Sequence, residues 1–270
     1  MGHLKGLVRA CLVASLAGLT ACGGGSESHA DPGDTAGSLP AAPDAPPSGL
    51  YVGYYAEDPV TNPEDPTYGA FQLFFPEDAA DFAGSMFFTY EGCQSSNVGA
   101  VRGSRVGGSI SGLFAGDVDG VPQHGRYQGA FDSVTHSYSG TYSIDGGKQY
   151  RNLLPCIDYY IAPNGTFEMH RVGESQPRDF RVSMNGRNVQ WSSLNGAGLT
   201  LVYVLDPVAS TARPATTNPV IWQGLLEGAS VLTLPATVSL RSGTEYIAAV
   251  AVGAMNQRPM AFGSVRFVMP

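Results

Sequence analysis

Residues 112–131, GLFAGDVDGVPQHGRYQGAF, carry the pattern that decides the fold of the first half of this chain. They hold two copies of the motif Gly-x-aromatic-x-Gly, at 112–116 and 125–129, with the turn-forming dipeptide Asp119-Gly120 between them. Alternate side chains of a strand share a face, so each ring lies on the same face as its two glycines. The glycines leave room for a ring from a neighbouring strand and permit strong coiling. The pattern predicts an antiparallel meander or a small barrel.

The same motif recurs on both sides of this stretch in the sequence. A full copy occupies residues 49–53, and half-copies begin at Gly140 and Gly165. After residue 22 no stretch shows a long helical period, and short apolar and aromatic runs alternate with turn signals instead. We therefore predict an all-β protein. The strands that we expect in this half are 51–55, 70–75, 85–90, 109–114, 125–131, 138–144, 157–161 and 166–169.

Composition and charge exclude several classes of protein. The chain has 270 residues and a net charge of -8, which is a poor fit to nucleic-acid binding because that function needs clustered cations. Apolar residues make up 43% and aromatic residues 10%, too much for a disordered chain. We expect one or two globular units with real cores and no nucleic-acid partner.

The N-terminal residues predict the cellular localisation of the protein. Met1 to Arg9 carry cations without an acid, and an apolar run follows from Ala10 to Leu19, too short for a permanent membrane span. The run ends in Leu19-Thr20-Ala21-Cys22, which resembles the lipobox of bacterial lipoproteins. That resemblance implies cleavage before Cys22, lipid on its sulfur, and stable anchoring to a membrane. Because Gly23 rather than Asp follows, it implies the outer membrane, with the chain facing the periplasm or the cell surface. The alternative is an ordinary secretory signal with a chance cysteine.

Processing leaves Cys93 and Cys156 as the free thiols of a chain in an oxidising compartment. We predict that they form a disulfide, which would contribute about 4 kcal/mol in the chain-entropy model. A metal or redox pair is the weaker alternative, because neither cysteine belongs to a CxxC motif. Between the lipobox and residue 48 the chain is rich in Gly, Ser, Ala and Pro, so we expect it to be a flexible tether.

The second half of the chain resembles a fibronectin type III domain. The resemblance rests on ordered strand candidates at 180–182, 189–191 and 201–204, followed by Leu240-Arg-Ser-Gly-Thr-Glu-Tyr246. This last run matches the tyrosine corner of the family except that Ser242 replaces Pro. The resemblance implies an Ig-like β-sandwich in which the Tyr246 hydroxyl bonds back to the backbone and Trp191, like the tyrosine, belongs to the core.

In its content of Gly and aromatic residues, the first half loosely resembles the barrels of lipocalin-like and transferrin-binding-type surface lipoproteins. No site residue follows from that resemblance. The predicted organisation has four segments. They are a signal peptide at 1–21, the lipidated cysteine and tether at 22–48, the Gly- and aromatic-rich β-domain at 49–173 and the β-sandwich at 177–270.

The sequence contains few residue patterns that indicate metal binding or catalysis. Asp117, Asp119 and His124 form a candidate cation site, because alternate carboxylates of a tight loop are able to converge on Ca²⁺. A polar hairpin turn is the favoured interpretation of the same residues. The pairs Glu57-Asp58 and Glu64-Asp65 predict an acidic loop that is either solvated or binds a cation or a basic partner. The chain lacks nucleophile-elbow, zincin, P-loop and dinucleotide motifs, and we expect no cofactor.

Two classes of function remain at this point. The favoured hypothesis is a non-catalytic cell-envelope lipoprotein that binds an unknown protein or glycan ligand through its β-domains. The alternative is a lipid-anchored hydrolase acting on envelope or extracellular glycans, since fibronectin-type modules often accompany secreted carbohydrate enzymes. A deep pocket with paired carboxylates would favour the hydrolase, and a filled interior would favour the binding protein.

Overall fold

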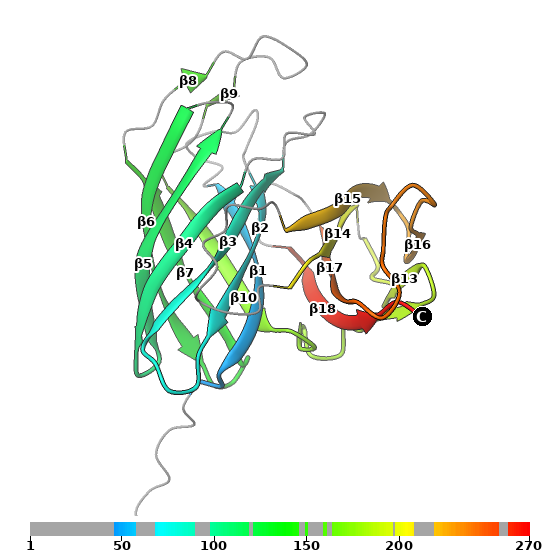
Figure 1. Ribbon diagram of the computed structural model, residues 1–270, viewed down its shortest axis with the longest axis horizontal. Helices are drawn as coiled ribbons and strands as arrows, with labels where there is room; N and C mark the ends of the chain where they lie inside the picture. The colour runs from blue at the N-terminus through cyan, green and yellow to red at the C-terminus, as the bar shows by residue number, and fades with distance from the viewer. Residues whose placement is uncertain are drawn as a thin grey trace, which may run out of the picture. The chain divides into compact units, whose positions relative to one another are not determined.

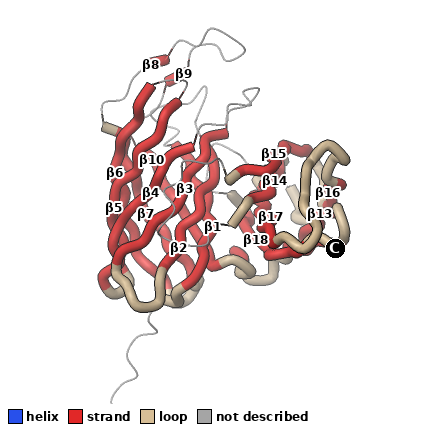
Figure 2. The backbone as a smooth tube through the Cα atoms, in the orientation of Figure 1, coloured by secondary structure: helices blue, strands red, loops and turns tan. Residues whose placement is uncertain are grey.

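A computed structural model describes most of the chain after residue 45. The described residues are 46–57, 68–89, 98–118, 121–145, 149–150, 159–160, 164–196, 198–207, 219–253 and 259–270. Their regular elements are all β-strands (Figure 2), so the predicted all-β class is confirmed. No helix in these ranges is long and apolar enough to cross a membrane.

Eight antiparallel strands close into a barrel in which each strand pairs with the next along the chain (Figure 1). They are β1 (Gly49–Glu57), β2 (Tyr68–Phe75), β3 (Asp81–Thr89), β4 (Val98–Val106), β5 (Ser109–Val118), β6 (Val121–Asp132), β7 (Ser137–Ile144) and β10 (Asn164–Arg171). Closure comes from the pairing of β10 with β1. Two short strands, β8 (Gln149–Tyr150) and β9 (Tyr159–Tyr160), pair with each other in the connection between β7 and β10.

Rings and glycines interdigitate inside the barrel, as the Gly-x-aromatic-x-Gly motif predicts. Many of the inward rings lie over glycines of other strands, where an added side chain would collide with the ring. A Cβ on Gly103 would lie 2.3 Å from the Tyr127 hydroxyl, and one on Gly125 would lie 2.1 Å from Cζ of Phe114. The core residues are Tyr51, Tyr55, Phe71, Leu73, Phe75, Phe82, Met86, Val101, Ile110, Phe114, Tyr127, Tyr138, Tyr142, Ile144, Phe167 and Met169.

A short strap at Pro46–Pro47 leads into β1 and is fixed to one rim of the barrel. Arg105 donates from its guanidinium to the carbonyls of Pro46, at 3.1 Å, and Pro76, at 3.4 Å, and its charge lies 5.3 Å from the ring centroid of Phe75. The Tyr51 hydroxyl donates to the Pro47 carbonyl at 2.8 Å. We call this end, which also carries the turns after β2, β4 and β6, the strap rim. The opposite end, where β1, β3, β5 and β7 finish, is the loop rim.

Residues after the barrel form a sandwich of two sheets. One sheet has the order β11-β18-β17-β14-β15 and the other the order β12-β13-β16. The strands are β11 (Ser175–Gln176), β12 (Val182–Asn185), β13 (Asn188–Trp191), β14 (Leu199–Leu205), β15 (Val220–Glu227), β16 (Val231–Thr233), β17 (Glu245–Val252) and β18 (Ala261–Val268). Trp191 and Tyr246 lie in the core between the sheets, as predicted. The Tyr246 hydroxyl accepts a hydrogen bond from the Arg241 N–H at 2.9 Å, so the predicted bond back to the backbone is present.

The five-stranded sheet is covered on both faces, which explains its continuous apolar runs. Val202 and Val204 of β14 face the sandwich core, whereas Leu201, Tyr203 and Leu205 pack against the barrel. The barrel side of this seam consists of outward side chains of β1, β2 and β3, and the Gln72 side-chain amide donates to the Asp206 carbonyl at 2.9 Å across it. The seam buries outward barrel residues that alternation alone would place in solvent.

Candidate functional site

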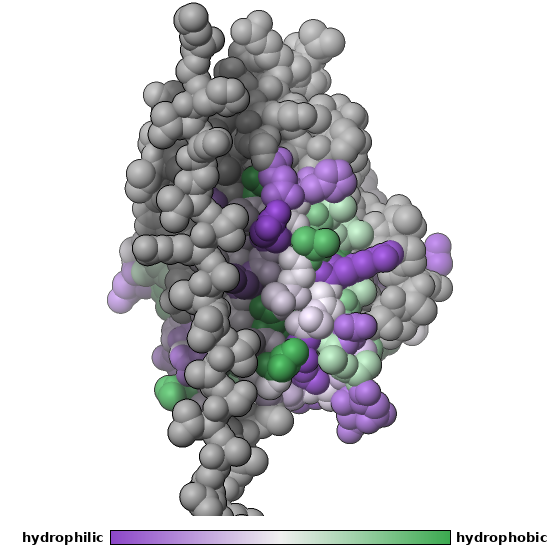
Figure 3. Space-filling model, turned by 90° about the vertical axis from the view of Figure 1, so that its left-hand side faces the viewer, coloured by the Kyte–Doolittle hydropathy of each residue, from purple (hydrophilic) through white to green (hydrophobic). Residues whose placement is uncertain are grey.

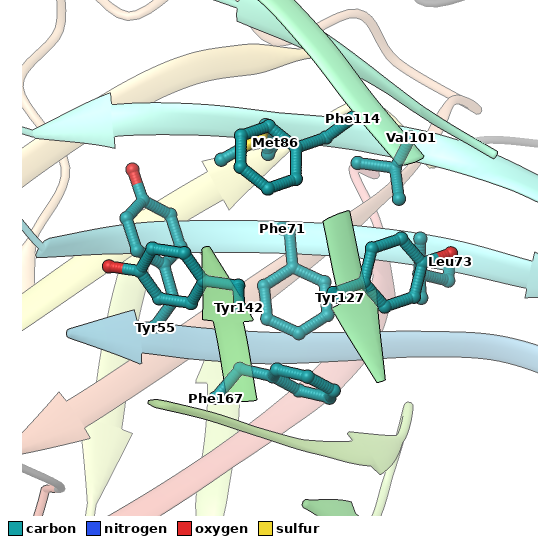
Figure 4. Close-up of a pocket in the computed structure, with 9 residues that line it drawn as sticks. All are labelled: Tyr55, Phe71, Leu73, Met86, Val101, Phe114, Tyr127, Tyr142 and Phe167. Atoms are coloured by element: carbon teal, nitrogen blue, oxygen red, sulfur yellow. The ribbon is translucent and has the colours of Figure 1, made fainter. Parts of the chain in front are cut away.

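The barrel encloses a cavity of about 40 Å³ among its rings. Figure 4 shows these side chains converging from the barrel strands. The lining residues are Tyr55, Phe71, Leu73, Met86, Val101, Phe114, Tyr127, Tyr142 and Phe167. Ligand pockets for small molecules have volumes of roughly 300–1,000 Å³, whereas this cavity has space for only a few waters. A sugar or a lipid would therefore have to displace rings that already pack against one another.

The tyrosine hydroxyls of the cavity are held by the barrel itself. Tyr55 donates to the Phe87 carbonyl at 3.0 Å and Tyr127 to the Arg102 carbonyl at 3.1 Å. Burial raises the pKa of Tyr127, and burial together with the nearby Glu57 raises the pKa of Tyr142. Both phenols stay neutral at physiological pH, so they supply no base for catalysis.

Glu57 changes one expectation from the sequence. We predicted it as part of an acidic loop, but it is the last residue of β1 and only 2% exposed. The alternation of β1 places it on the inward side with Tyr55. Among the described residues it is the single buried carboxylate on that side, whereas glycoside hydrolysis ordinarily uses a pair of carboxylates. The interior in this part of the chain therefore lacks the arrangement that would favour the hydrolase.

Two larger hollows lie on the outer wall of the barrel. One, of about 470 Å³, crosses β4, β5, β6 and β7 and is lined by Ser104, Val106, Ser109, Ile110, Ser111, Gln128, Gly129, Ala130, Gly140 and Thr141. The other, of about 330 Å³, is lined by Tyr54, Ala56, Ser139, Gly140, Thr141, Thr166, Phe167, Glu168 and Pro259. In Figure 3 the coloured residues of the visible face are mixed, with hydrophilic, pale and hydrophobic residues side by side. The second hollow, which we call the side groove, is the one that contains a carboxylate.

Glu168 of the side groove belongs to a buried hydrogen-bonded pair that sequence reasoning missed. His170 Nε2 lies 3.1 Å from Glu168 Oε1, and the two side chains are 1% and 10% exposed. Alternation along β10 places both residues on the outward face, so the local pattern predicts exposure. The seam buries them instead, and the His170 ring lies 6.1 Å from the Phe262 ring of β18. No local signal indicates this burial, because it depends on the packing of β18 against the barrel.

The other predicted site residues are placed only in part. Cys22, Cys93, Cys156 and Asp119 lie outside the described residues, so the lipid site and the disulfide stay predictions. The backbone of Asp117 belongs to β5 and pairs with Pro122.

The histidine of the candidate cation site, His124, is exposed on β6 opposite Ala115. Within the described ranges no group of three or more His, Cys, Asp or Glu side chains is placed to hold a metal ion.

Because known proteins suggest no function for this chain, the functional argument rests on the geometry described above. No protein-family model, no curated protein and no solved structure matches this chain.

Proposed function

We propose that this chain is a non-catalytic, lipid-anchored lipoprotein of the outer membrane that binds a protein or glycan ligand with the outer surfaces of its β-domains. The observation that carries the proposal is the ring-filled interior of the barrel, whose cavity of about 40 Å³ is too small for such a ligand. A filled barrel is a rigid scaffold, and binding residues on rigid scaffolds are commonly carried by the loops and faces around them.

The strap fixes the rim at which the described chain enters the barrel. The tether that follows Cys22 reaches the barrel at Pro46–Pro47, on the strap rim. The loop rim is the opposite end of the barrel from this point of entry.

The charge of the connections supports a basic protein as the partner at the loop rim. These connections are residues 58–67, 90–97, 119–120 and 145–163. They contain seven acidic residues against two basic ones. Like charges on one rim produce a field that attracts cationic groups and raises the rate of encounter.

The strand order of the second unit supports its resemblance to fibronectin type III domains. Three strands, β12, β13 and β16, form one sheet, and β14, β15, β17 and β18 form the main part of the other. The hydrogen bond between Arg241 N–H and the Tyr246 hydroxyl supplies the tyrosine corner of such sandwiches. In the proposed function this module is an accessory that supports the barrel along the seam.

The experiment that tests this function measures binding of the full lipidated chain, in neutral vesicles, to a fluorescent decalysine peptide. A loop-rim variant carries Asp58→Asn, Glu64→Gln and Asp65→Asn. Because a solvent-exposed ion pair is typically worth about 0.2–1 kcal/mol, loss of three charges should weaken binding by about three-fold to 150-fold relative to the parent.

The matched control removes three acids near the strap rim, with Glu77→Gln, Asp78→Asn and Asp81→Asn, all of which are exposed in the parent. The control should keep more of the binding than the loop-rim variant. Equal losses in the two variants would mean a non-specific charge effect and would overturn the proposed binding face. Absence of any binding by the parent would overturn it as well.

A further inference from the structure

The side groove has the dimensions and the wall of a small-molecule site. Its volume of about 330 Å³ lies within the usual range for ligand pockets. Its floor is built from outward side chains of three adjacent strands, β1, β10 and β7, which stand in two cross-strand rows. Direct register pairs define the rows as Tyr54, Glu168 and Ser139 in one and Ala56, Thr166 and Thr141 in the other.

A fixed carboxylate distinguishes this groove from a merely hollow wall. The Glu168 side chain is nine-tenths buried, and Oε1 is within hydrogen-bond distance of Nε2 of His170. The neighbouring outward positions of β1 in the seam, Leu50 and Val52, are apolar. Burial of a carboxylate and an imidazole in such a place costs desolvation energy that apolar side chains would not. The physical effect of the pair is to hold one carboxylate in a defined orientation at the wall of the groove, as preorganised binding groups are held.

The second row and its neighbours supply neutral hydrogen-bonding groups. Ser139, Thr141 and Thr166 are exposed, and each hydroxyl both donates and accepts. Ala56 and Pro259 add small apolar surfaces, and the described residues that line the groove include no Lys or Arg. A single carboxylate beside several hydroxyls matches a neutral ligand that carries many O–H groups. A cation would leave the donor capacity of the hydroxyls unused.

We propose that the side groove binds a sugar unit of a glycan, with Glu168 accepting hydrogen bonds from ligand hydroxyls and Ser139, Thr141 and Thr166 exchanging hydrogen bonds with the remainder. The inference rests on the proposed function, for which it supplies the glycan site. The sugar site does not depend on the loop rim or on a basic partner. A negative result with decalysine would therefore leave the sugar site standing, and a negative result with the sugars below would leave the loop rim standing.

The test is a titration followed by NMR on the isotope-labelled full chain in detergent micelles. The probes are N-acetylglucosamine, glucose and, as the cationic comparison, ethanolamine. We expect at least one of the two sugars to shift the amide signals of Thr141 and Thr166 in a saturable manner, with ethanolamine leaving them in place. Shifts with ethanolamine alone, or no saturable shift with either sugar, would overturn the assignment. This mapping uses the unmodified chain, so it does not depend on the folding of any variant.

A paired variant then tests the hydroxyls. Thr141→Val together with Thr166→Val keeps the side-chain shape and removes two hydroxyls, and we expect the affinity for the bound sugar to fall about ten-fold. The control is Thr237→Val, which removes an exposed hydroxyl from a turn of the sandwich. Glu168→Gln should also weaken binding, because the amide loses the charge-assisted hydrogen bonds. An unchanged affinity in the paired variant, or an equal loss in the control, would contradict the proposed contacts.

Discussion

Substitution of Gly165 by alanine tests the packing rule of the barrel most directly. Gly165 lies on β10 opposite Tyr142 of β7. An added Cβ would lie 2.3 Å from Cζ and 2.4 Å from Cε1 and the hydroxyl oxygen of that ring, far inside van der Waals contact. The ring has little freedom to move away, since it packs edge-on against Tyr55 at 5.8 Å and against Phe114 at 6.2 Å. We expect Gly165→Ala to lower the free energy of unfolding by about 1–3 kcal/mol, the usual cost of overpacking.

A double-mutant cycle separates this collision from a general cost of alanine. In a Tyr142→Leu background the ring is absent, so the same Gly165→Ala change should cost about 1–3 kcal/mol less than in the parent. Gly108→Ala is the matched control in the same barrel. The nearest atom to its added Cβ is the Phe131 Cβ at 3.7 Å, an ordinary contact. This control should change the stability by no more than about 0.5 kcal/mol.

The assay is equilibrium unfolding in urea, followed by far-ultraviolet circular dichroism, on all five chains under one set of conditions. Comparable slopes against urea would show that the unfolded states expose similar surface, so that the midpoints report stability. An equal cost of Gly165→Ala in both backgrounds would refute the ring and glycine interdigitation. So would a stabilising effect in the parent background.

Three further predictions concern the organisation of the chain. Cys22→Ser should leave an unprocessed or soluble precursor, because only the thiol accepts the lipid, and recovery of the variant with membranes at the mature mass would contradict the anchor. Mass spectrometry of protein taken from the envelope should find Cys93 and Cys156 joined, and two free thiols would remove the disulfide. Fragments 49–173 and 177–270 should each unfold cooperatively, at lower stability than in the full chain because separation exposes the apolar seam; failure of both fragments to do so would reject two independent units.

Local sequence patterns predicted much of the architecture because β-structure leaves a two-residue period wherever one face is buried. Most barrel strands overlapped expected runs, and the pairing of inward rings with glycines followed from the repeated motif. β15 and β18 of the second unit were not among the expected strands, and neither was β4, from Val98 to Val106. Its inward positions include Gly99, Val101 and Gly103, which are too small to mark a buried face, and Arg102 and Arg105 further obscure the alternation. The small residues are explained only by the Met86 and Tyr127 side chains that occupy their space.

The sequence by itself therefore determined the all-β class, the alternation of rings and glycines along the strands and the core positions of Trp191 and Tyr246, since each depends on neighbours along one strand or one turn. Closure of the barrel by β10 against β1, the seam, and the burial of the Glu168 and His170 pair were decided by the tertiary structure. These features join residues far apart in the chain, and outward side chains have the same local pattern whether solvent or another sheet covers them. The side groove is of this kind, because its floor unites strands from both ends of the barrel sequence and its edge includes Pro259 of the second unit.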